Sequence, residues 1–280
     1  MTTGSTAADE TPPPYAPGAP FDLPGGPDAA LLLHGLTGSP HEMRFVAERL
    51  HRSGLRCLGP LMRGHGGDPR ALLAIGWRDW VDGARQELRR LDGARQVAVV
   101  GCSMGALVSC ALAASEPERV AALVLLAPAL RLGPPAALGA FLGRRAAVRR
   151  WCPLVPKPGG SDVADPEQRR ANPTMPAVPL PAVAELAELA RRVDGLLPEV
   201  RAPALVVAGR HDHTVRLSGA RRIAARLGSG PARLVVLERS FHLVGIDVDR
   251  ERCADEVAAF VETTLAAGRG GQGGAAWRPT

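Results

Sequence analysis

The sequence lacks any apolar run long enough to cross a membrane and any closely spaced pair of cysteines. A membrane-spanning helix needs roughly 18 uninterrupted apolar residues, and no stretch of this chain reaches that length. The five cysteines form no C-x-x-C pair, so neither a disulfide scaffold nor a zinc cluster is indicated. The first 20 residues include acidic residues but no basic residue and no apolar run, unlike a signal peptide. We therefore expect a soluble, cytoplasmic protein.

Lysine is nearly absent, because Lys157 is the only one and arginine supplies the other 33 of the 34 basic residues. The net charge is +6 and the isoelectric point is near 9.7, which first suggests binding to nucleic acid or another anionic surface. Hydrophobic residues make up 46% of the chain and charged residues 22%, as in ordinary globular proteins. The position of the arginines therefore decides what the positive charge means.

Proline and glycine are concentrated at the two ends of the chain. Residues 1–28 contain seven prolines, and residues 267–280 contain five glycines. Segments of this composition bury too little apolar area to offset their conformational entropy. We predict a disordered proline-rich tail over residues 1–28, a folded domain over 29–266 and a flexible glycine-rich tail over 267–280.

Short apolar runs alternate with helical patterns inside the predicted domain. Continuous apolar strands separated by helices are typical of a parallel sheet that helices cover on both faces. The alternation breaks at about residues 129–184, where no clear strand is visible and we expect an inserted cap over the sheet. The predicted fold is α/β, with a mostly parallel sheet, helices on both faces and this cap. The predicted strands are Ala29–Leu33, Leu55–Leu58, Val97–Val100, Val120–Leu126, Ala204–Ala208 and Arg233–Leu237.

Two helices have recognisable ends in the sequence. The run Ser39-Pro40-His41-Glu42 combines a capping serine, a proline at the first helical position and an acid, which predicts a capping box. We expect this helix to end at Gly54. The last helix is predicted over about Arg250–Leu265.

A serine lies between a predicted buried strand and a predicted helix, in the run Gly101-Cys102-Ser103-Met104-Gly105. So tight a strand-to-helix turn needs residues without a Cβ two positions before and two positions after the serine, because the chain segments approach closely there. The serine hydroxyl then projects above the sheet at the positive end of the helix. This pattern predicts Ser103 as a nucleophile.

A serine nucleophile needs a histidine base and an acid that holds the base. Asp212 follows the predicted strand 204–208, and His242 follows the predicted strand 233–237. The carboxyl ends of parallel strands meet at one edge of a sheet, so both side chains are expected near Ser103. We predict Asp212 as the acid and His242 as the base. The other candidates are His211, His213, Asp194, Asp247 and Asp249.

A glycine-rich loop, His34-Gly35-Leu36-Thr37-Gly38, follows the first predicted strand. Attack on a carbonyl creates an oxyanion, which preorganised N–H groups must stabilise. We predict the backbone N–H groups of Leu36 and Met104 as these donors. His34 is expected to hold the loop by its own hydrogen bonds rather than to act as a base.

These motifs together resemble the α/β-hydrolase superfamily, in the capped group of carboxylesterases and monoacylglycerol lipases that is related to the serine aminopeptidase S33 family. The resemblance covers nearly all of residues 29–266. It implies that the nucleophile, acid and base of the family are Ser103, Asp212 and His242, and that its oxyanion donors are Leu36 and Met104. It rests on LLLHGLTGSPHEMR (31–44), PLMRGHGGDP (60–69), WRDWVDGA (77–84), VVGCSMGA (99–106), PALVVAGRHDHTV (203–215) and SFHLVGIDVDRE (240–251).

The expected activity is hydrolysis of carboxylic esters of apolar acyl groups, without a metal or other cofactor. The small-molecule ester is expected to bind at Leu36 and Met104, and Trp151 in the cap is a candidate for lining the acyl pocket. Alternatives on the same fold are an aminopeptidase, a C–C bond hydrolase and a non-catalytic ligand-binding protein.

Much of the positive charge lies in the predicted cap, where residues 129–184 contain eight basic and three acidic residues. Arg144, Arg145, Arg149 and Arg150 lie beside Phe141, Leu142, Val148 and Trp151, which predicts a basic amphipathic helix. A nucleic-acid partner is therefore not expected. The patch is either a solvated surface or a site of transient contact with anionic lipid.

Overall fold

A central sheet of seven strands organises the computed structural model, which describes residues 17–270. The strand order is β1-β3-β2-β4-β5-β8-β9, and every neighbouring pair is parallel except β1 and β3. The predicted mostly parallel sheet is confirmed. The strands are β1 (Phe21–Leu23), β2 (Ala29–Leu33), β3 (Arg56–Gly59), β4 (Val97–Cys102), β5 (Ala122–Leu126), β8 (Ala204–Gly209) and β9 (Arg233–Leu237).

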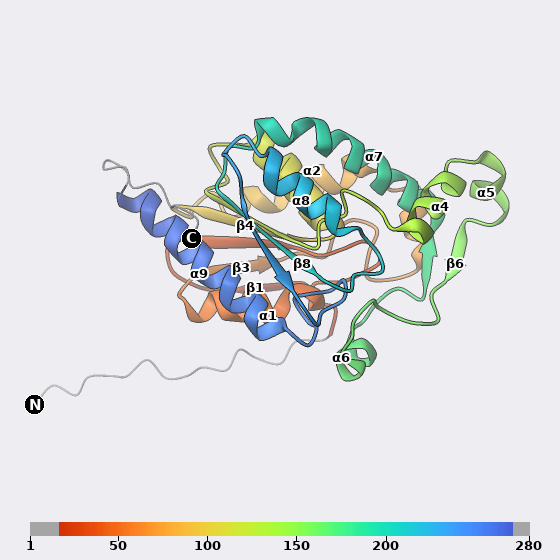
Figure 1. Cartoon of the computed structure of the whole chain (residues 1–280), viewed down its shortest axis with the longest axis horizontal. Coiled ribbons are helices and arrows are strands. Elements are labelled where there is room, and N and C mark those ends of the chain that lie inside the picture. The colour runs from red at the N-terminus through yellow and green to blue at the C-terminus, as the bar shows by residue number, and fades with distance from the viewer. Residues whose placement is uncertain (1–16, 271–280) are drawn as a thin grey trace, which may run out of the picture.

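Helices cover both faces of this sheet (Figure 1). One face packs against α1 (His41–Arg52) and α9 (Arg250–Gly270). The other packs against α2 (Trp77–Arg89), α3 (Met104–Ser115), α7 (Leu180–Leu196) and α8 (Leu217–Arg226). Two short 3-10 helices, η1 (Pro69–Ala74) and η2 (Leu197–Glu199), complete this part of the fold.

Burial of the central strands on both sides explains their unbroken apolar sequences. In β2, Leu31 and Leu33 pack into the core on the α3 side, and Ala30 and Leu32 pack into the core on the α1 side. Alternate residues of a strand point to opposite faces, so both sets must be apolar when both faces are covered. No helix within residues 17–270 is both long and apolar enough to cross a membrane.

The prediction of a disordered tail over residues 1–28 is wrong for its described part. Residues 21–23 form β1, which pairs antiparallel with β3 at the edge of the sheet, and Phe21 is buried over Gly59. A strand this short is defined by its partner, β3, rather than by its own sequence. Residues 1–16, the rest of the predicted tail, lie outside the described residues.

An ion-pair cluster connects both predicted tails to the domain. The buried carboxylate of Asp28 accepts hydrogen bonds from Arg95 Nε and Nη2 at 2.9 and 2.7 Å, and from Arg269 Nη1 at 2.8 Å. Arg269 belongs to α9, which continues to Gly270, beyond the predicted end at Leu265. The glycine-rich tail predicted from residue 267 is therefore helical over 267–270, and residues 271–280 lie outside the described residues.

The predicted capping box at the start of α1 is also wrong. Pro40 occupies the N-cap position, and the buried Ser39 hydroxyl has no hydrogen-bond partner among the described residues. Glu42 instead accepts a hydrogen bond from the Gly35 N–H at 3.1 Å, in the loop after β2. The glutamate therefore stabilises a neighbouring loop rather than its own helix. At the other end, Gly54 follows the helix with a positive φ of 89°.

The inserted cap lies between β5 and α7 and extends from one end of the sheet (Figure 1). No strand is clear in the sequence of this segment, but β6 and β7 pair antiparallel within it. The predicted basic helix is interrupted, since α4 ends at Gly143 and α5 begins at Ala146. The elements of the cap are α4 (Pro134–Gly143), α5 (Ala146–Trp151), β6 (Leu154–Pro156), α6 (Pro166–Ala171) and β7 (Ala177–Pro179).

We expect Phe21→Ala to lower the free energy of unfolding by about 3 kcal/mol, because it removes a buried aromatic ring from the sheet edge. Chemical denaturation followed by circular dichroism measures this change. The same substitution at Phe141, which is 53% exposed on α4, is the control and should change stability by less than about 0.5 kcal/mol. Equal free energies of unfolding for the two variants would show that β1 does not contribute to the stability of the domain.

Candidate functional site

Ser103 occupies the turn between β4 and α3 in a backbone conformation that side chains rarely adopt, with a φ of 55°. A Cβ at Gly105 would lie 2.1 Å from the Leu33 carbonyl oxygen, and a Cβ at Gly101 would lie 2.3 Å from the Gly105 oxygen. Both glycines are therefore required by backbone contacts, as the sequence pattern predicted. The close packing places Ser103 at the N-terminus of α3 and above the carboxyl edge of the sheet.

The structure brings the three predicted catalytic side chains into one hydrogen-bonded line. Ser103 Oγ lies 2.9 Å from His242 Nε2, and His242 Nδ1 lies 2.7 Å from Asp212 Oδ2. The other oxygen of Asp212 accepts hydrogen bonds from the Thr214 and Val215 N–H groups, both at 2.8 Å. Each side chain extends from a loop at the carboxyl end of a different strand, β4, β8 or β9. The geometry is that of a nucleophile, a base and an acid that orients the base.

Burial and charge act in opposite directions on the acid and the base. Burial by itself would raise the pKa of Asp212, but His242 and the two loop N–H groups stabilise the carboxylate and lower its pKa below the usual value. Burial by itself would lower the pKa of His242, but the negative charge of Asp212 and its hydrogen bond raise that pKa above the usual value, with further contributions from Asp162 and Glu42. The pair therefore favours an ionised aspartate and an imidazole that is more basic than usual.

Two backbone N–H groups lie beside Ser103 without a partner of their own. Met104 begins α3, and Leu36 lies in the loop after β2; within residues 17–270 neither N–H donates a hydrogen bond. A Cβ at Gly35 would lie 3.3 Å from the Ser103 Cβ, so this loop packs directly against the nucleophile. The arrangement can bind an oxyanion that forms at an attacked carbonyl.

The histidine in this loop has a structural position. His34 Nδ1 donates to the Gly35 carbonyl at 2.9 Å, and its Nε2 accepts from the Met62 N–H at 3.0 Å. Its ring contacts His65 edge-on at 4.9 Å between centroids. Burial, followed by the proximity of His65, lowers the pKa of His34 to about 3. His34 is therefore neutral and holds the loop, as predicted.

The other candidate acids and bases have different partners. Asp194 pairs with Arg222 on α8, and Asp249 pairs with Arg239. His213 donates from its backbone to Asp162 in the cap. His211 follows β8, where its backbone N–H bonds the Ser240 carbonyl. Among these candidates, Asp247 is fully buried and accepts a hydrogen bond from the Phe241 N–H beside His242.

A cavity of about 390 Å³ opens above Ser103 and His242. Its wall is mostly apolar and comes largely from the cap and α7, and its polar groups come from the loop after β2, from α1 and from the cap. The apolar residues include Leu132, Ala136, Val178, Leu180, Val183 and Leu186, and the polar ones include Thr37, Glu42, Lys157, Ser161 and Asp162.

Trp151 does not line this cavity, so its predicted place in the pocket is wrong. Its side chain lies at the end of α5 and is 76% exposed. The guanidinium carbon of Arg150 lies over its ring instead, 4.9 Å from the ring centroid. Within residues 17–270, no group of three or more histidine, cysteine, aspartate or glutamate side chains is arranged to hold a metal ion.

Sequence reasoning missed three polar residues of the cavity. Glu42 holds the Gly35 N–H, Lys157 Nζ lies 2.8 Å from the Thr174 hydroxyl, and Asp162 binds the loop after Asp212. Burial raises the pKa of Glu42, although the Gly35 hydrogen bond and Lys157 oppose the change. Lys157 could have been singled out in the sequence, because it is the only lysine. Glu42 and Asp162 are ordinary acidic residues, and the loops they bind are not indicated by any local pattern.

Several known proteins are similar to this chain. The sequence profile of the family described as serine aminopeptidase, S33, matches residues 27–249. A carboxylesterase from Bacillus subtilis (strain 168) is 26% identical over 247 residues, which cover 87% of this chain and 96% of that protein. A thermostable monoacylglycerol lipase from Bacillus sp. (strain H-257) is 28% identical over 242 residues, covering 86% of this chain and 93% of the lipase.

A solved structure is also similar at the level of sequence. It is described as belonging to "LipS and LipT, two metagenome-derived lipolytic enzymes", and it superposes with a TM-score of 0.79 and 31% identity. The match covers 88% of this chain and 98% of the other. A monoacylglycerol lipase from Paleococcus ferrophilus has a TM-score of 0.72 at 17% identity, which shows a shared fold.

We expect the reactivity of Ser103 toward a fluorophosphonate to fall as the pH decreases through a value above 6.5, the ordinary pKa of histidine. Only the neutral imidazole can accept the serine proton, and Asp212 raises the pKa at which this form is lost. Labelling rates measured across pH test this expectation. Asp212→Asn is the control and should lower the pH at which the labelling rate falls. A fall centred below pH 6.5 in the unaltered protein would contradict the expectation.

Proposed function

Because the chain belongs to the serine aminopeptidase S33 family and has the α/β-hydrolase fold, we propose that this ester hydrolase cleaves carboxylic esters of apolar acyl groups through Ser103, His242 and Asp212. The observation that carries the proposal is the hydrogen-bonded line from Ser103 Oγ through His242 to Asp212 beneath a mostly apolar cavity. Its substrates are carboxylesters of the kind cleaved by a carboxylesterase or a monoacylglycerol lipase.

The mechanism follows from the position of each group. Ser103 Oγ donates its proton to His242 Nε2 as the oxygen attacks the ester carbonyl, and the carboxylate of Asp212 stabilises the imidazolium. The N–H groups of Leu36 and Met104 bind the oxyanion. His242 then donates the proton to the leaving alcohol, which departs as the acyl-enzyme forms. Water then attacks the acyl-enzyme with His242 as base, and His242 returns the proton to Ser103 Oγ as the carboxylic acid is released.

The composition of the cavity favours an apolar acyl group over a peptide amino terminus. An aminopeptidase site must present a carboxylate to the substrate ammonium group. The carboxylate of Asp162 is instead engaged by His213 and Thr214, and that of Glu42 by Gly35. The wall formed by Leu132, Val178 and the cavity-facing residues of α7 suits a hydrocarbon chain, whose burial is favourable by about 25 cal/mol per Å².

Ser103→Ala is expected to reduce hydrolysis of a short-chain nitrophenyl ester by about four orders of magnitude or more, because it removes the nucleophile. The matched control is Ser115→Ala at the far end of α3, which should retain activity. Turnover of a panel of nitrophenyl esters of increasing acyl length, monoacylglycerols and an aminoacyl anilide should favour the esters. Retained turnover in Ser103→Ala, or preference for the anilide, would refute the proposal, and absent fluorophosphonate labelling would favour a binding protein.

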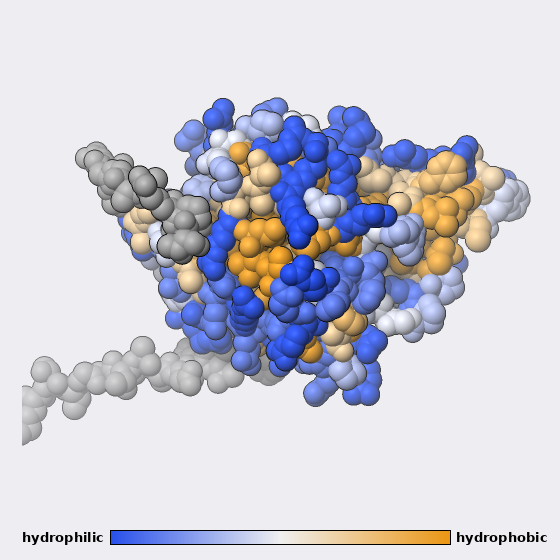
Figure 2. Space-filling model, viewed as in Figure 1, coloured by the Kyte–Doolittle hydropathy of each residue, from blue (hydrophilic) through white to orange (hydrophobic). Residues whose placement is uncertain are grey.

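We also propose that the outer face of the cap makes transient contact with anionic lipid. Four apolar side chains there are strongly exposed, in a hydrophobic area that Figure 2 shows on the right of the molecule. The adjacent arginines are exposed, and two of them lie over aromatic rings, Arg145 over Phe141 and Arg150 over Trp151, at 4.4 and 4.9 Å. An apolar surface with a basic border suits the interface of an anionic membrane. The exposed apolar residues are Leu138, Phe141, Trp151 and Val155, the last of which also lines the cavity.

Replacing Arg144, Arg145, Arg149 and Arg150 together by glutamine should weaken binding to anionic vesicles by about 100-fold or more, since each basic residue near such a surface contributes about 1 kcal/mol. Vesicle sedimentation measures this affinity at low and high salt. Arg169→Gln with Arg170→Gln, on α6 of the same cap, is the control and should bind as before. Binding that survives loss of the four arginines would eliminate the lipid-contact proposal.

A further inference from the structure

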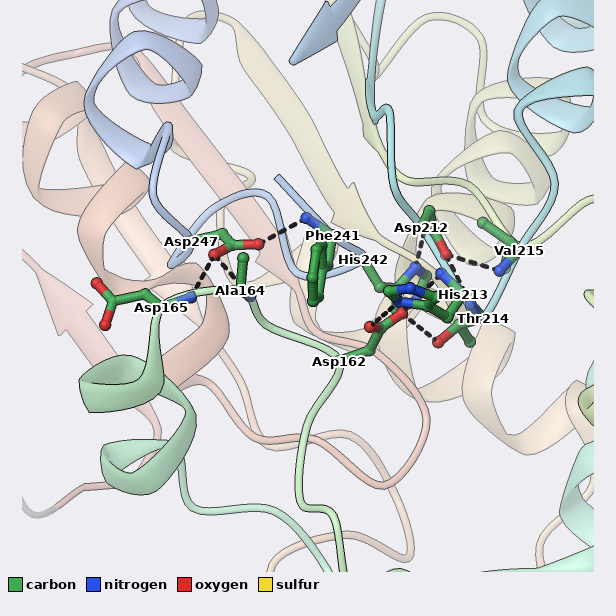
Figure 3. A network of polar contacts seen from close by, with 10 residues as sticks. All are labelled: Asp162, Ala164, Asp165, Asp212, His213, Thr214, Val215, Phe241, His242 and Asp247. Carbon is green, nitrogen blue, oxygen red and sulfur yellow. Dashed lines mark hydrogen bonds and ion pairs between the residues drawn. The ribbon is translucent and has the colours of Figure 1, made fainter. Parts of the chain in front are cut away.

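A segment of the cap crosses the loops that carry the base and the acid. It comprises residues 160–165 and leads from β6 to α6. Asp162, in the middle of this segment, lines the cavity, and its side chain is 18% exposed. Figure 3 shows Asp162 beside both catalytic loops, with the residues that follow it, Ala164 and Asp165, leading toward Asp247.

The carboxylate of Asp162 holds the loop that follows the catalytic acid. Its Oδ2 accepts hydrogen bonds from the His213 N–H and the Thr214 hydroxyl, both at 3.0 Å, and its Oδ1 lies 2.8 Å from His213 Nδ1. The Thr214 N–H in turn donates to Asp212 Oδ1 at 2.8 Å. The loop is therefore held between two carboxylates, one from β8 and one from the cap (Figure 3).

The main chain of the same residue holds the loop of the base. The Asp162 carbonyl oxygen accepts hydrogen bonds from the N–H groups of His242 and Leu243, at 3.1 and 3.2 Å. A single cap residue thus contacts the acid loop by its side chain and the base residue by its backbone. Movement of this residue would change the relative position of Asp212 and His242.

A fully buried aspartate fixes the segment on the base side. Asp247 Oδ1 accepts hydrogen bonds from the N–H groups of Ala164 and Asp165 at 2.9 and 3.0 Å. Its Oδ2 accepts one from the Phe241 N–H, directly before His242, at 2.7 Å. The cap segment and the base loop therefore share one carboxylate, which limits the positions that Asp162 can take (Figure 3).

We propose that Asp162 is a positioning residue of the hydrolase. It holds the loops that carry Asp212 and His242 in a fixed relative position and adds negative charge beside the base. The inference rests on the proposed function, since it assigns Asp162 a part in the Ser103–His242–Asp212 chemistry. It makes the cap a structural support of the triad as well as a wall of the substrate cavity.

The charges around His242 give the proposal a distinctive consequence. The negative groups that face it are Asp212, Asp162 and Glu42, and all three raise its pKa against the effect of burial. Lys157 is the nearby cation and interacts with Glu42 and Asp162. His213, whose Nδ1 contacts Asp162, is exposed. Loss of the Asp162 charge removes one of the three negative contributions, so the pKa of His242 should decrease.

The test compares Asp162→Asn and Asp162→Ala with a control, Glu167→Gln. Glu167 is an exposed acid on α6 of the same cap and lies outside the cavity. The readout is the fluorophosphonate labelling rate of Ser103 across pH, because it reports the base without a substrate-specific step. Circular dichroism establishes which variants fold. Asp162→Asn keeps one oxygen that can accept from the His213 N–H and the Thr214 hydroxyl, but it loses the oxygen that faces His213 Nδ1.

Asp162→Asn should label about 10- to 100-fold more slowly at high pH, because small displacements of catalytic groups cause losses of this size. The pH below which its labelling rate falls should also be lower than in the unaltered protein. Asp162→Ala, if folded, should show a larger loss, and Glu167→Gln should match the unaltered protein. The assignment of Asp162 as a positioning residue would be overturned if Asp162→Asn showed the same labelling rates across pH as the unaltered protein. It would also be overturned by a slower rate that falls at the same pH. Failure of the unaltered protein to label would instead overturn the proposed function.

Discussion

The approach of α3 to the carboxyl end of β2 is the contact on which the site depends. No side chain fits at Gly105, because a Cβ there would lie 2.1 Å from the Leu33 oxygen. The turn before α3 must therefore be tight, and Ser103 takes a positive φ within it. The same contact brings the loop of Leu36 against the serine, so the nucleophile and both predicted oxyanion donors are positioned by one packing interaction. Strain in the serine backbone is maintained because the buried sheet and helix around it leave no relaxed alternative.

Electrostatics complete what this packing begins. His242 is buried, which by itself would weaken it as a base, yet the carboxylates of Asp212, Asp162 and Glu42 face it and raise its pKa. Buried carboxylates are themselves costly unless they are hydrogen-bonded. Each of the three accepts backbone N–H groups: those of Thr214 and Val215, of His213, and of Gly35, respectively. The same hydrogen bonds that stabilise the loops therefore stabilise the carboxylates, whose negative charge raises the pKa of His242.

The cap has different chemistry on its two sides. Toward the sheet it supplies Val178 to the apolar wall and Asp162 to the catalytic loops. Away from the sheet it exposes Phe141 and Trp151 among arginines. The break between α4 and α5 lies between Phe141 and Trp151, and both side chains are exposed. The proposed acyl wall and the proposed lipid contact therefore involve largely different residues of the cap, with Val155 shared between them.

Sequence alone determined the parts of this protein that depend on short stretches of chain. Buried strands, the glycines around Ser103 and the order of Asp212 and His242 after their strands are visible because backbone geometry and two-sided burial restrict which residues can occur there. Tertiary structure decided the rest. Phe21 is in a strand because β3 pairs with it, Glu42 bonds a loop instead of its helix, and Trp151 faces outward. Asp162 meets His213 and His242 across 51 and 80 residues of sequence, and such contacts follow from how the cap folds over the sheet rather than from any local pattern.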